Sequence, residues 1–196
     1  LYSSAASDVY KRQDTLIDLY RQAARRVHTG ERITHLAHAW QCGRLAEKSG
    51  ASLSLQLASW LHDVGHLHVQ SLKPNGDFQP VDHASLGAQM LKPLLGQAVS
   101  EPVRLHVLAK RYLVTTRENY ARKLSADALQ SLARQGGHLS EEECAEFERH
   151  EFFADAIKLR VWDDLGKKEG WFEVAPHDAL DDLRALMLSV SATCVT

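Results

Sequence analysis

The apolar residues of this chain recur at helical spacing along nearly its whole length, and this periodicity limits the folds open to it. The first clear stripe, which Asp14 can cap, places apolar side chains three and four residues apart over residues 16–27. Further helices are expected over residues 33–49, 52–64, 82–95, 101–113, 126–134, 141–150, 153–167 and 176–187. No useful alternating run predicts a β-strand. The predicted fold class is therefore all-α.

The predicted helices form one domain, over residues 14–188. A chain of 196 residues suffices for one sizeable core. Residues 1–13 show no helical or strand period and resemble translated adapter sequence, and residues 189–196 are equally uninformative. We interpret both segments as non-native or disordered tails. Within the domain, Gly65 is expected near the end of the third helix, and residues 71–80 are expected to form a loop.

Charge and cysteine content argue against several classes of protein. The 23 Lys and Arg and the 25 Asp and Glu give a formal net charge of −2, so no global basic field indicates nucleic-acid binding. No apolar run approaches the roughly 20 residues that span a bilayer, so no membrane partner is expected. Cys42, Cys144 and Cys194 are odd in number and widely spaced, which favours a reduced, cytoplasmic location over a disulfide framework. The sequence gives no indication of the oligomeric state.

The strongest functional signal is a histidine–aspartate pair. His62 and Asp63 follow one another at the end of the apolar segment 57–61, where an unpaired charge would be costly. A metal ion is an economical partner, because imidazole suits iron, zinc and manganese, and a carboxylate can bridge two cations. A buried His-Asp pair at a helix end is the alternative, and the dipeptide by itself favours that alternative.

Four further residues of ligand type lie on successive predicted helices. His38 precedes His62 by 24 residues, and a helical hairpin between them can bring the two together. His83 begins the next helix, His106 lies within another, and Asp163 follows an apolar stretch. Each residue alone is more often an ordinary core or surface residue. Together they favour a two-metal site formed by His38, His62, Asp63, His83, His106 and Asp163.

These residues carry a family resemblance. The H…HD…D pattern of the HD superfamily is matched by His38, His62, Asp63 and Asp163, and the two extra ligands of its dinuclear members are matched by His83 and His106. Four more blocks resemble the HD-domain phosphonate oxygenases, namely EPVRLH at 101–106, AKRYL at 109–113, QGG at 135–137 and LRVWDD at 159–164. The resemblance covers nearly all of residues 28–177 and implies an HD-domain helical bundle.

The resemblance also implies a cofactor and a reaction. One iron ion would be held by His38, His62 and Asp163, the second by His83 and His106, with Asp63 as the bridge. The two iron ions would form a mixed-valent Fe2+/Fe3+ pair, with O2 as co-substrate and with His62 and Asp63 at the catalytic centre. The implied reaction cleaves the C–P bond of a small organophosphonate, a 1-hydroxyphosphonate, to give phosphate and a carboxylic acid.

Six positions match substrate-binding residues of that family. They are His66, Lys110 and Arg160 for the phosphonate group, Glu31 for an amino group, His28 beside the iron, and Gln135 in the Gln-Gly-Gly block. Lys110 and Arg160 each lie one helical turn from a ligand, which suits cations that hold a small dianion, although a solvated helix face is the alternative. Three departures argue against the usual 2-amino-1-hydroxyethyl substrate: His28 stands for a tyrosine, Ala128 for a serine and His35 for a glutamine.

Two other functions compete with the oxygenase. An HD phosphohydrolase would use the same ligands to activate water against a phosphate ester or nucleotide. A non-catalytic HD module would bind a nucleotide or phosphonate as a sensor. The complete ligand set argues against the sensor, because a sensor need not keep every ligand.

Overall fold

The computed structural model describes residues 2–26, 32–72, 82–171 and 174–193, with the backbone alone described for residues 2–9, 127 and 193. Within these ranges the chain is helical and contains no β-strand, which confirms the all-α prediction. The elements are α1 (Tyr2–Ala23), α2 (His35–Lys48), α3 (Leu53–Leu61), α4 (Val64–Leu72), α5 (His83–Leu95), α6 (Gln97–Thr116), η1 (Ala121–Lys123), α7 (Ala126–Arg134), α8 (Glu141–Glu148), α9 (Phe153–Leu165) and α10 (Pro176–Thr193).

Side chains that cap the helices fix where most of them begin. Thr34, Ser52, Asp82 and Ser125 each accept a hydrogen bond from the backbone N–H three residues later. Ser140 forms a reciprocal capping box with Glu143 at the start of α8. These caps explain why the starts of α3, α5, α7 and α8 agree with the predictions from sequence.

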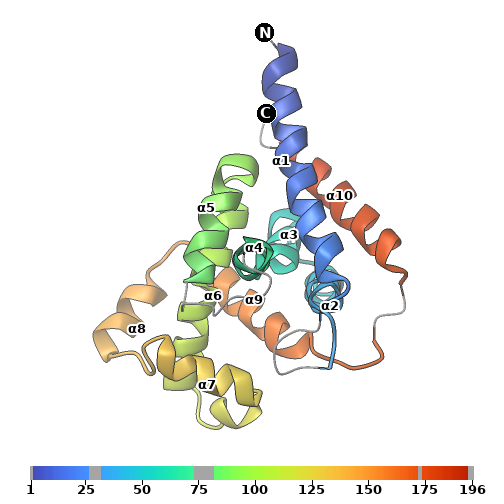
Figure 1. The fold of residues 1–196 in the computed structure, drawn as a ribbon. Helices are drawn as coiled ribbons and strands as arrows, with labels where there is room; N and C mark the ends of the chain where they lie inside the picture. The colour runs from blue at the N-terminus through green and yellow to red at the C-terminus, as the bar shows by residue number, and fades with distance from the viewer. Residues whose placement is uncertain (1, 27–31, 73–81, 172–173, 194–196) are drawn as a thin grey trace.

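The two ends of the chain differ from the prediction. Helix α1 begins at Tyr2 rather than at Asp14, and α10 continues to Thr193. The ends lie side by side (Figure 1), where the buried Gln13 amide donates to the Ser191 hydroxyl at 2.9 Å. A helix nucleated by the buried stripe around Leu16 can extend toward Tyr2 at little further cost, although residues 2–13 have no apolar stripe of their own. The interpretation of residues 1–13 and 189–196 as non-native or disordered tails stays a prediction.

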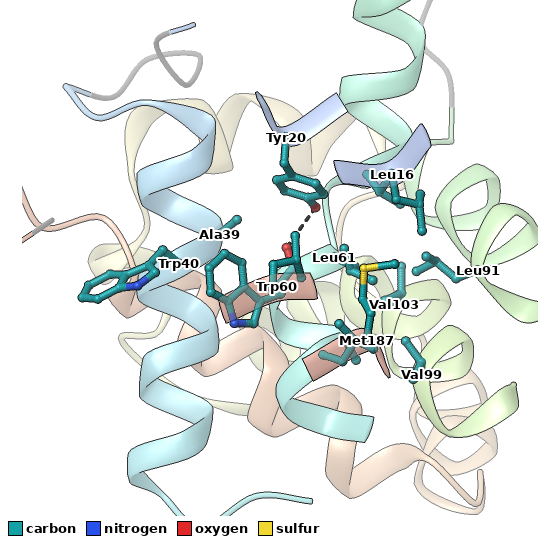
Figure 2. Close-up of a cluster of buried hydrophobic side chains, with 14 of the residues drawn as sticks. Leu16, Tyr20, Ala39, Trp40, Trp60, Leu61, Leu91, Val99, Val103 and Met187 are labelled. Carbon is teal, nitrogen blue, oxygen red and sulfur yellow. Dashed lines mark hydrogen bonds between the residues drawn. The ribbon is translucent and has the colours of Figure 1, made fainter. Parts of the chain in front are cut away.

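The core forms around α3, which carries the apolar segment before His62. Figure 2 shows Leu61 among side chains from α5, α6 and α10, including Leu91, Val103 and Met187. Tyr20 on α1 is also buried, and its hydroxyl donates to the Trp60 carbonyl at 2.9 Å. Helices α7 and α8 lie at the opposite end of the molecule from α1 and α10 (Figure 1).

The sequence predicts one helix through Val64, but the structure has two. Helix α3 ends at Leu61 and α4 starts at Val64, so His62 and Asp63 form the joint between them. Gly65 therefore lies in the first turn of α4 rather than near the end of α3. A Cβ at Gly65 would come within 2.1 Å of the His83 carbonyl oxygen, so the glycine is required by the close approach of α4 to α5. Within the described ranges, no helix has both the length and the apolar composition needed to cross a membrane.

Candidate metal centre

Four histidines from separate elements converge beside the core. His38 on α2 and His62 at the joint place their Nε2 atoms 3.2 Å apart, and His83 on α5 and His106 on α6 place theirs 3.1 Å apart. All four side chains are buried, with between 1% and 7% of their surface exposed. Two nitrogens bound to one ion at about 2.1 Å and at a near-right angle lie about 3 Å apart. Each pair therefore has the spacing of two neighbouring ligands on one metal.

Backbone carbonyls hold three of these rings from behind. The Nδ1 atoms of His38, His62 and His106 lie 2.8, 2.9 and 2.7 Å from carbonyl oxygens. The acceptors are Gly166, Ser59 and Val103. Because a carbonyl oxygen only accepts, each Nδ1 donates its proton, and the Nε2 lone pair turns toward the centre. This is the usual arrangement of metal-binding histidines.

Asp63 lies between the two histidine pairs. Its Oδ2 is 3.9 Å from His38 Nε2 and 3.6 Å from His62 Nε2, whereas its Oδ1 is 3.8 Å from His83 Nε2. One carboxylate thus directs a different oxygen at each pair, which is the geometry of a bridging ligand. Asp163 faces the first pair, with its Oδ1 3.2 Å from His38 Nε2 and 3.7 Å from His62 Nε2.

Cys42 is a competing donor for the first pair, since its Sγ lies near both His38 and His62. The Sγ is 3.7 Å from His38 Nδ1 and 3.9 Å from Nε2, and the thiol donates to the Trp162 carbonyl. Burial, followed by the charge of Asp163, raises the pKa of Cys42 well above its usual value. A protonated thiol is a poor ligand. Asp163, which lies closer to Nε2, is therefore the better third donor.

The charges in the centre show why a cation fits it. Burial lowers the pKa of His62, but the carboxylates of Asp63 and Asp163 outweigh burial and raise this pKa to about 9. Burial and the charge of His62 lower the pKa of His106 to about 4. The carboxylates thus draw positive charge toward the first pair, while the second pair keeps neutral rings with free lone pairs. This donor set suits a metal ion.

A cavity of about 700 Å³ opens onto the centre. Four of the candidate ligands line it: Asp63, His83, His106 and Asp163. Four of the six expected substrate-binding residues also line it, namely His66, Lys110, Gln135 and Arg160, together with Ala128. His28 and Glu31 lie outside the described residues. The size of the cavity suits a small ligand.

Lys110 is almost fully buried in the cavity wall, with 3% of its surface exposed. Its Nζ donates to the Ser131 hydroxyl at 2.8 Å and reaches the Ala128 carbonyl at 3.5 Å. Both partners are neutral. Burial, followed by the charge of Arg160, lowers the pKa of Lys110 to about 8. The alternative of a solvated helix face does not hold for Lys110, which is a buried cation suited to an anionic ligand.

Arg160 is also buried, but carboxylates surround it. Its Nη1 lies 2.7 Å from Asp163 Oδ2, and its Nε and Nη2 donate to Asp164. Burial raises the pKa of Asp163, but Arg160 and Lys167 outweigh burial and hold this pKa well below its usual range. Arg160 therefore keeps the candidate ligand Asp163 ionised and fixes its orientation.

His66 has an exposed ring that stacks on His83, with the ring centroids 3.7 Å apart and the planes at 15°. It lies at the cavity wall, beside the second histidine pair. Gln135 ends α7, and its Oε1 is buried without a hydrogen-bond partner among the described residues. Gln135 can therefore offer this oxygen to a molecule in the cavity, and His66 lies in the same cavity wall.

Sequence reasoning did not identify several other residues of the cavity wall. They are Gln70, Arg104, Arg111, Gln130, Ser131, Arg134 and Lys167. Ser131 could have been found, because it lies one helical turn after Ala128 on a strongly amphipathic helix. Arg111 lies in a block that carries the family resemblance but was given no role, and the structure shows that its guanidinium donates to the carbonyls of Gly136 and Gly137 in another such block.

The comparisons with known proteins agree with this geometry. The model of the HD domain family matches residues 35–135, which include five of the six candidate ligands. A hydroxymethylphosphonate dioxygenase from Gimesia maris is 41% identical over 142 residues, 71% of each chain. A [1-hydroxy-2-(trimethylamino)ethyl]phosphonate dioxygenase (glycine-betaine-forming) from Leisingera caerulea is 33% identical over 72% of each chain. An uncharacterized protein of Acanthamoeba polyphaga mimivirus is 32% identical over 85% of this chain and 78% of its own length.

The helical fold, the candidate metal ligands and the match to the HD domain model together define the class of this protein. It is an HD-domain protein with a candidate metal centre. The chain belongs to the HD-domain family and, within it, to the phosphonate oxygenases that these relatives represent.

Proposed function

We propose that this protein is a diiron oxygenase that cleaves the C–P bond of a small 1-hydroxyphosphonate with O2. The observation that carries the proposal is that one cavity is lined both by four candidate ligands, Asp63, His83, His106 and Asp163, and by the buried cations Lys110 and Arg160. The metal donors suit a redox metal, and the cations suit a dianion. The two named relatives, both phosphonate dioxygenases, support the same activity.

The donor set favours two iron ions in the Fe2+/Fe3+ state. The ligands of the first would be His38, His62 and Asp163, and those of the second His83 and His106, with Asp63 shared. Imidazole and carboxylate together suit non-haem iron. When bound, the metals supply a Lewis acid for the substrate oxygens and the electrons for dioxygen chemistry.

The protein's own groups bind and orient the substrate. Lys110 and Arg160 hold phosphonate oxygens over the metals, because both cations line the cavity beside the ligands. His66 and Gln135 close the polar wall around the substrate. His28 and Glu31 remain predicted contacts at the iron and at a C2 substituent.

Hydroxymethylphosphonate is the first substrate to test. The described cavity wall carries six basic side chains, namely Arg104, Lys110, Arg111, Arg134, Arg160 and Lys167, against three acidic ones, Asp63, Asp82 and Asp163. Two of those acids are candidate metal ligands, so a substrate with a cationic substituent would face an excess of like charge. The relative from Gimesia maris is named for this same phosphonate. The products would be formate and phosphate, with one O2 consumed per turnover.

The decisive experiment combines three measurements on protein purified anaerobically with iron. We expect two irons per chain, a mixed-valent EPR signal that changes on adding hydroxymethylphosphonate, and equal amounts of O2 consumed and phosphate released. The matched control replaces the phosphonate with a simple phosphate ester under strict anaerobiosis. Phosphate from the ester, with none from phosphonates in air, would instead identify a phosphohydrolase.

A further inference from the structure

A hydrogen-bonded chain runs from the turn after α6 to the candidate metal ligand Asp163. The Tyr120 hydroxyl donates to Asp164 Oδ2. Asp164 in turn accepts from Arg160, through Nε at 3.2 Å and through Nη2. Arg160 then contacts Asp163 Oδ2 at 2.7 Å. Neither the family pattern nor the proposed function gives a role to Tyr120 or Asp164.

A count of the N–H donors of Arg160 shows how this series of hydrogen bonds orients its guanidinium. A guanidinium has five N–H groups. Asp164 takes the one on Nε and one on Nη2, and Asp163 takes one on Nη1. The Tyr120 hydroxyl also contacts this guanidinium, so the described contacts leave at least one N–H on a terminal nitrogen. The two aspartates therefore orient the guanidinium and still leave it able to donate to an oxygen of a phosphonate.

Tyr120 secures Asp164 from the side of α7. Its ring packs against a small apolar cluster formed by Val114, Leu124, Ala128 and Leu132. The preceding residue, Asn119, has a φ of 66°, a left-handed conformation that asparagine tolerates better than most residues. The turn and the cluster thus fix the ring independently of α9. Its hydroxyl reaches across to Asp164, so one wall of the cavity fixes a carboxylate on the other.

We propose that Tyr120 and Asp164 are positioning residues, which act through Arg160 to present its remaining N–H donors to the phosphonate. This inference rests on the proposed function. Without the Tyr120 hydroxyl, Asp164 loses one of its fixed bonds and can rotate. Arg160 then loses the support that opposes Asp163, and its guanidinium no longer keeps one orientation toward the anion. Tyr120 bonds Asp164 and also contacts Arg160, so most of its effect should vanish when Asp164 can no longer hold Arg160.

The test uses Tyr120→Phe, Asp164→Asn and the double variant in the iron-loaded, anaerobic protein. Calorimetry gives the Kd of hydroxymethylphosphonate and of inorganic phosphate, and iron is counted in each sample. We expect Tyr120→Phe to raise Kd about fivefold, the loss of one hydrogen bond, and Asp164→Asn to raise it about tenfold or more, the loss of a charge-assisted pair. The double variant should lie closer to Asp164→Asn than to the product of the two single effects, and iron content should stay normal in Tyr120→Phe.

Tyr112→Phe is the matched control. Tyr112 also donates to a carboxylate, Glu148 Oε1, at 2.6 Å, but that contact is exposed and outside the cavity lining. Its Kd should equal that of the wild type. Unchanged Kd values in Tyr120→Phe, multiplied effects in the double variant, or lost iron in Tyr120→Phe would each overturn the positioning role. If Asp164→Asn does not fold, Tyr120→Phe alone tests the proposal, because phenylalanine keeps the ring that packs in the apolar cluster. Wild-type protein that binds neither anion would overturn the proposed function as well.

Discussion

Gly65 and His83 approach each other so closely that α4 and α5 meet backbone to backbone. A Cβ on residue 65 would lie 2.1 Å from the carbonyl oxygen of His83 and 3.0 Å from the backbone nitrogen of Gly87. Asp63, two residues earlier, faces the imidazole of the same His83 at 3.8 Å. The close packing of the two helices therefore sets the separation between the bridging carboxylate and the second histidine pair.

Substitution of Gly65 should damage both stability and the metal centre. In Gly65→Ala, the helices must separate, which we expect to lower the free energy of unfolding by about 1–3 kcal/mol and to reduce iron at His83 and His106. Thermal unfolding and iron analysis check this. Gly50→Ala is the control, because Gly50 has a φ of 71° and no atom within 4 Å of an added Cβ. It should cost some stability and leave the iron content unchanged. Equal iron loss in both variants would contradict the prediction.

The bridge makes a second prediction, about metal stoichiometry. Asp63→Ala should lose both irons, because its two oxygens face different histidine pairs. His83→Ala should lose mainly one, because His83 belongs to a single pair. Iron per chain after desalting, together with the EPR signal, measures this difference. If Asp63→Ala retained one tightly bound iron, Asp63 would be a ligand of one metal only.

The six candidate ligands could be predicted from the sequence because residue type and spacing both carry the information. His62 and Asp63 end an apolar segment, and His38, His83, His106 and Asp163 lie on other predicted helices, so a helical bundle that buries its apolar faces brings them together. The resemblance added the pairing of ligands with metals. Lys110 was expected at the site mainly from the resemblance, because its spacing of one turn from His106 is equally compatible with a solvated helix face.

The remaining features depend on contacts that no local pattern records. Gly65 resembles a helix terminator in sequence, yet its role is to admit another backbone. Tyr120 lies 44 residues from Asp164, and the turn at Asn119 that precedes it was not predictable from composition. The start of α1 was misplaced because residues 1–13 have no apolar stripe, whereas the helix continues from the buried part that follows.

Removal of Lys110 and removal of Arg160 should have different effects on iron content. Lys110→Ala should weaken phosphonate binding by about 2–5 kcal/mol and leave iron near normal, because the Lys110 ammonium contacts only neutral protein groups. Arg160→Ala should weaken binding and also lower iron content, because Arg160 holds Asp163. Substrate KM and iron per chain separate the two effects. Lys158→Ala, which removes an exposed lysine paired with Asp155, is the control and should change neither. Normal iron in Arg160→Ala would show that Asp163 holds its place unaided.

Lys110 should also set the alkaline limit of activity. Its pKa is about 8, lowered by burial and then by Arg160, so its ammonium loses a proton as the pH rises through 8. Only the charged form attracts the dianion, so kcat/KM for hydroxymethylphosphonate should be maximal below pH 8 and fall about tenfold per pH unit well above it. A bound dianion favours the ammonium and raises this pKa, so the fall in kcat should begin at higher pH than the fall in kcat/KM.

Lys110→Arg is the matched variant, because a guanidinium does not titrate in this range. At neutral pH the kcat/KM of this variant should be lower than that of the wild type, because the planar guanidinium fits the site less well than the ammonium. At high pH its kcat/KM should not fall. Another group would control the alkaline fall if the wild-type kcat/KM stayed flat to pH 10. The same would follow if Lys110→Arg kept the alkaline fall unchanged.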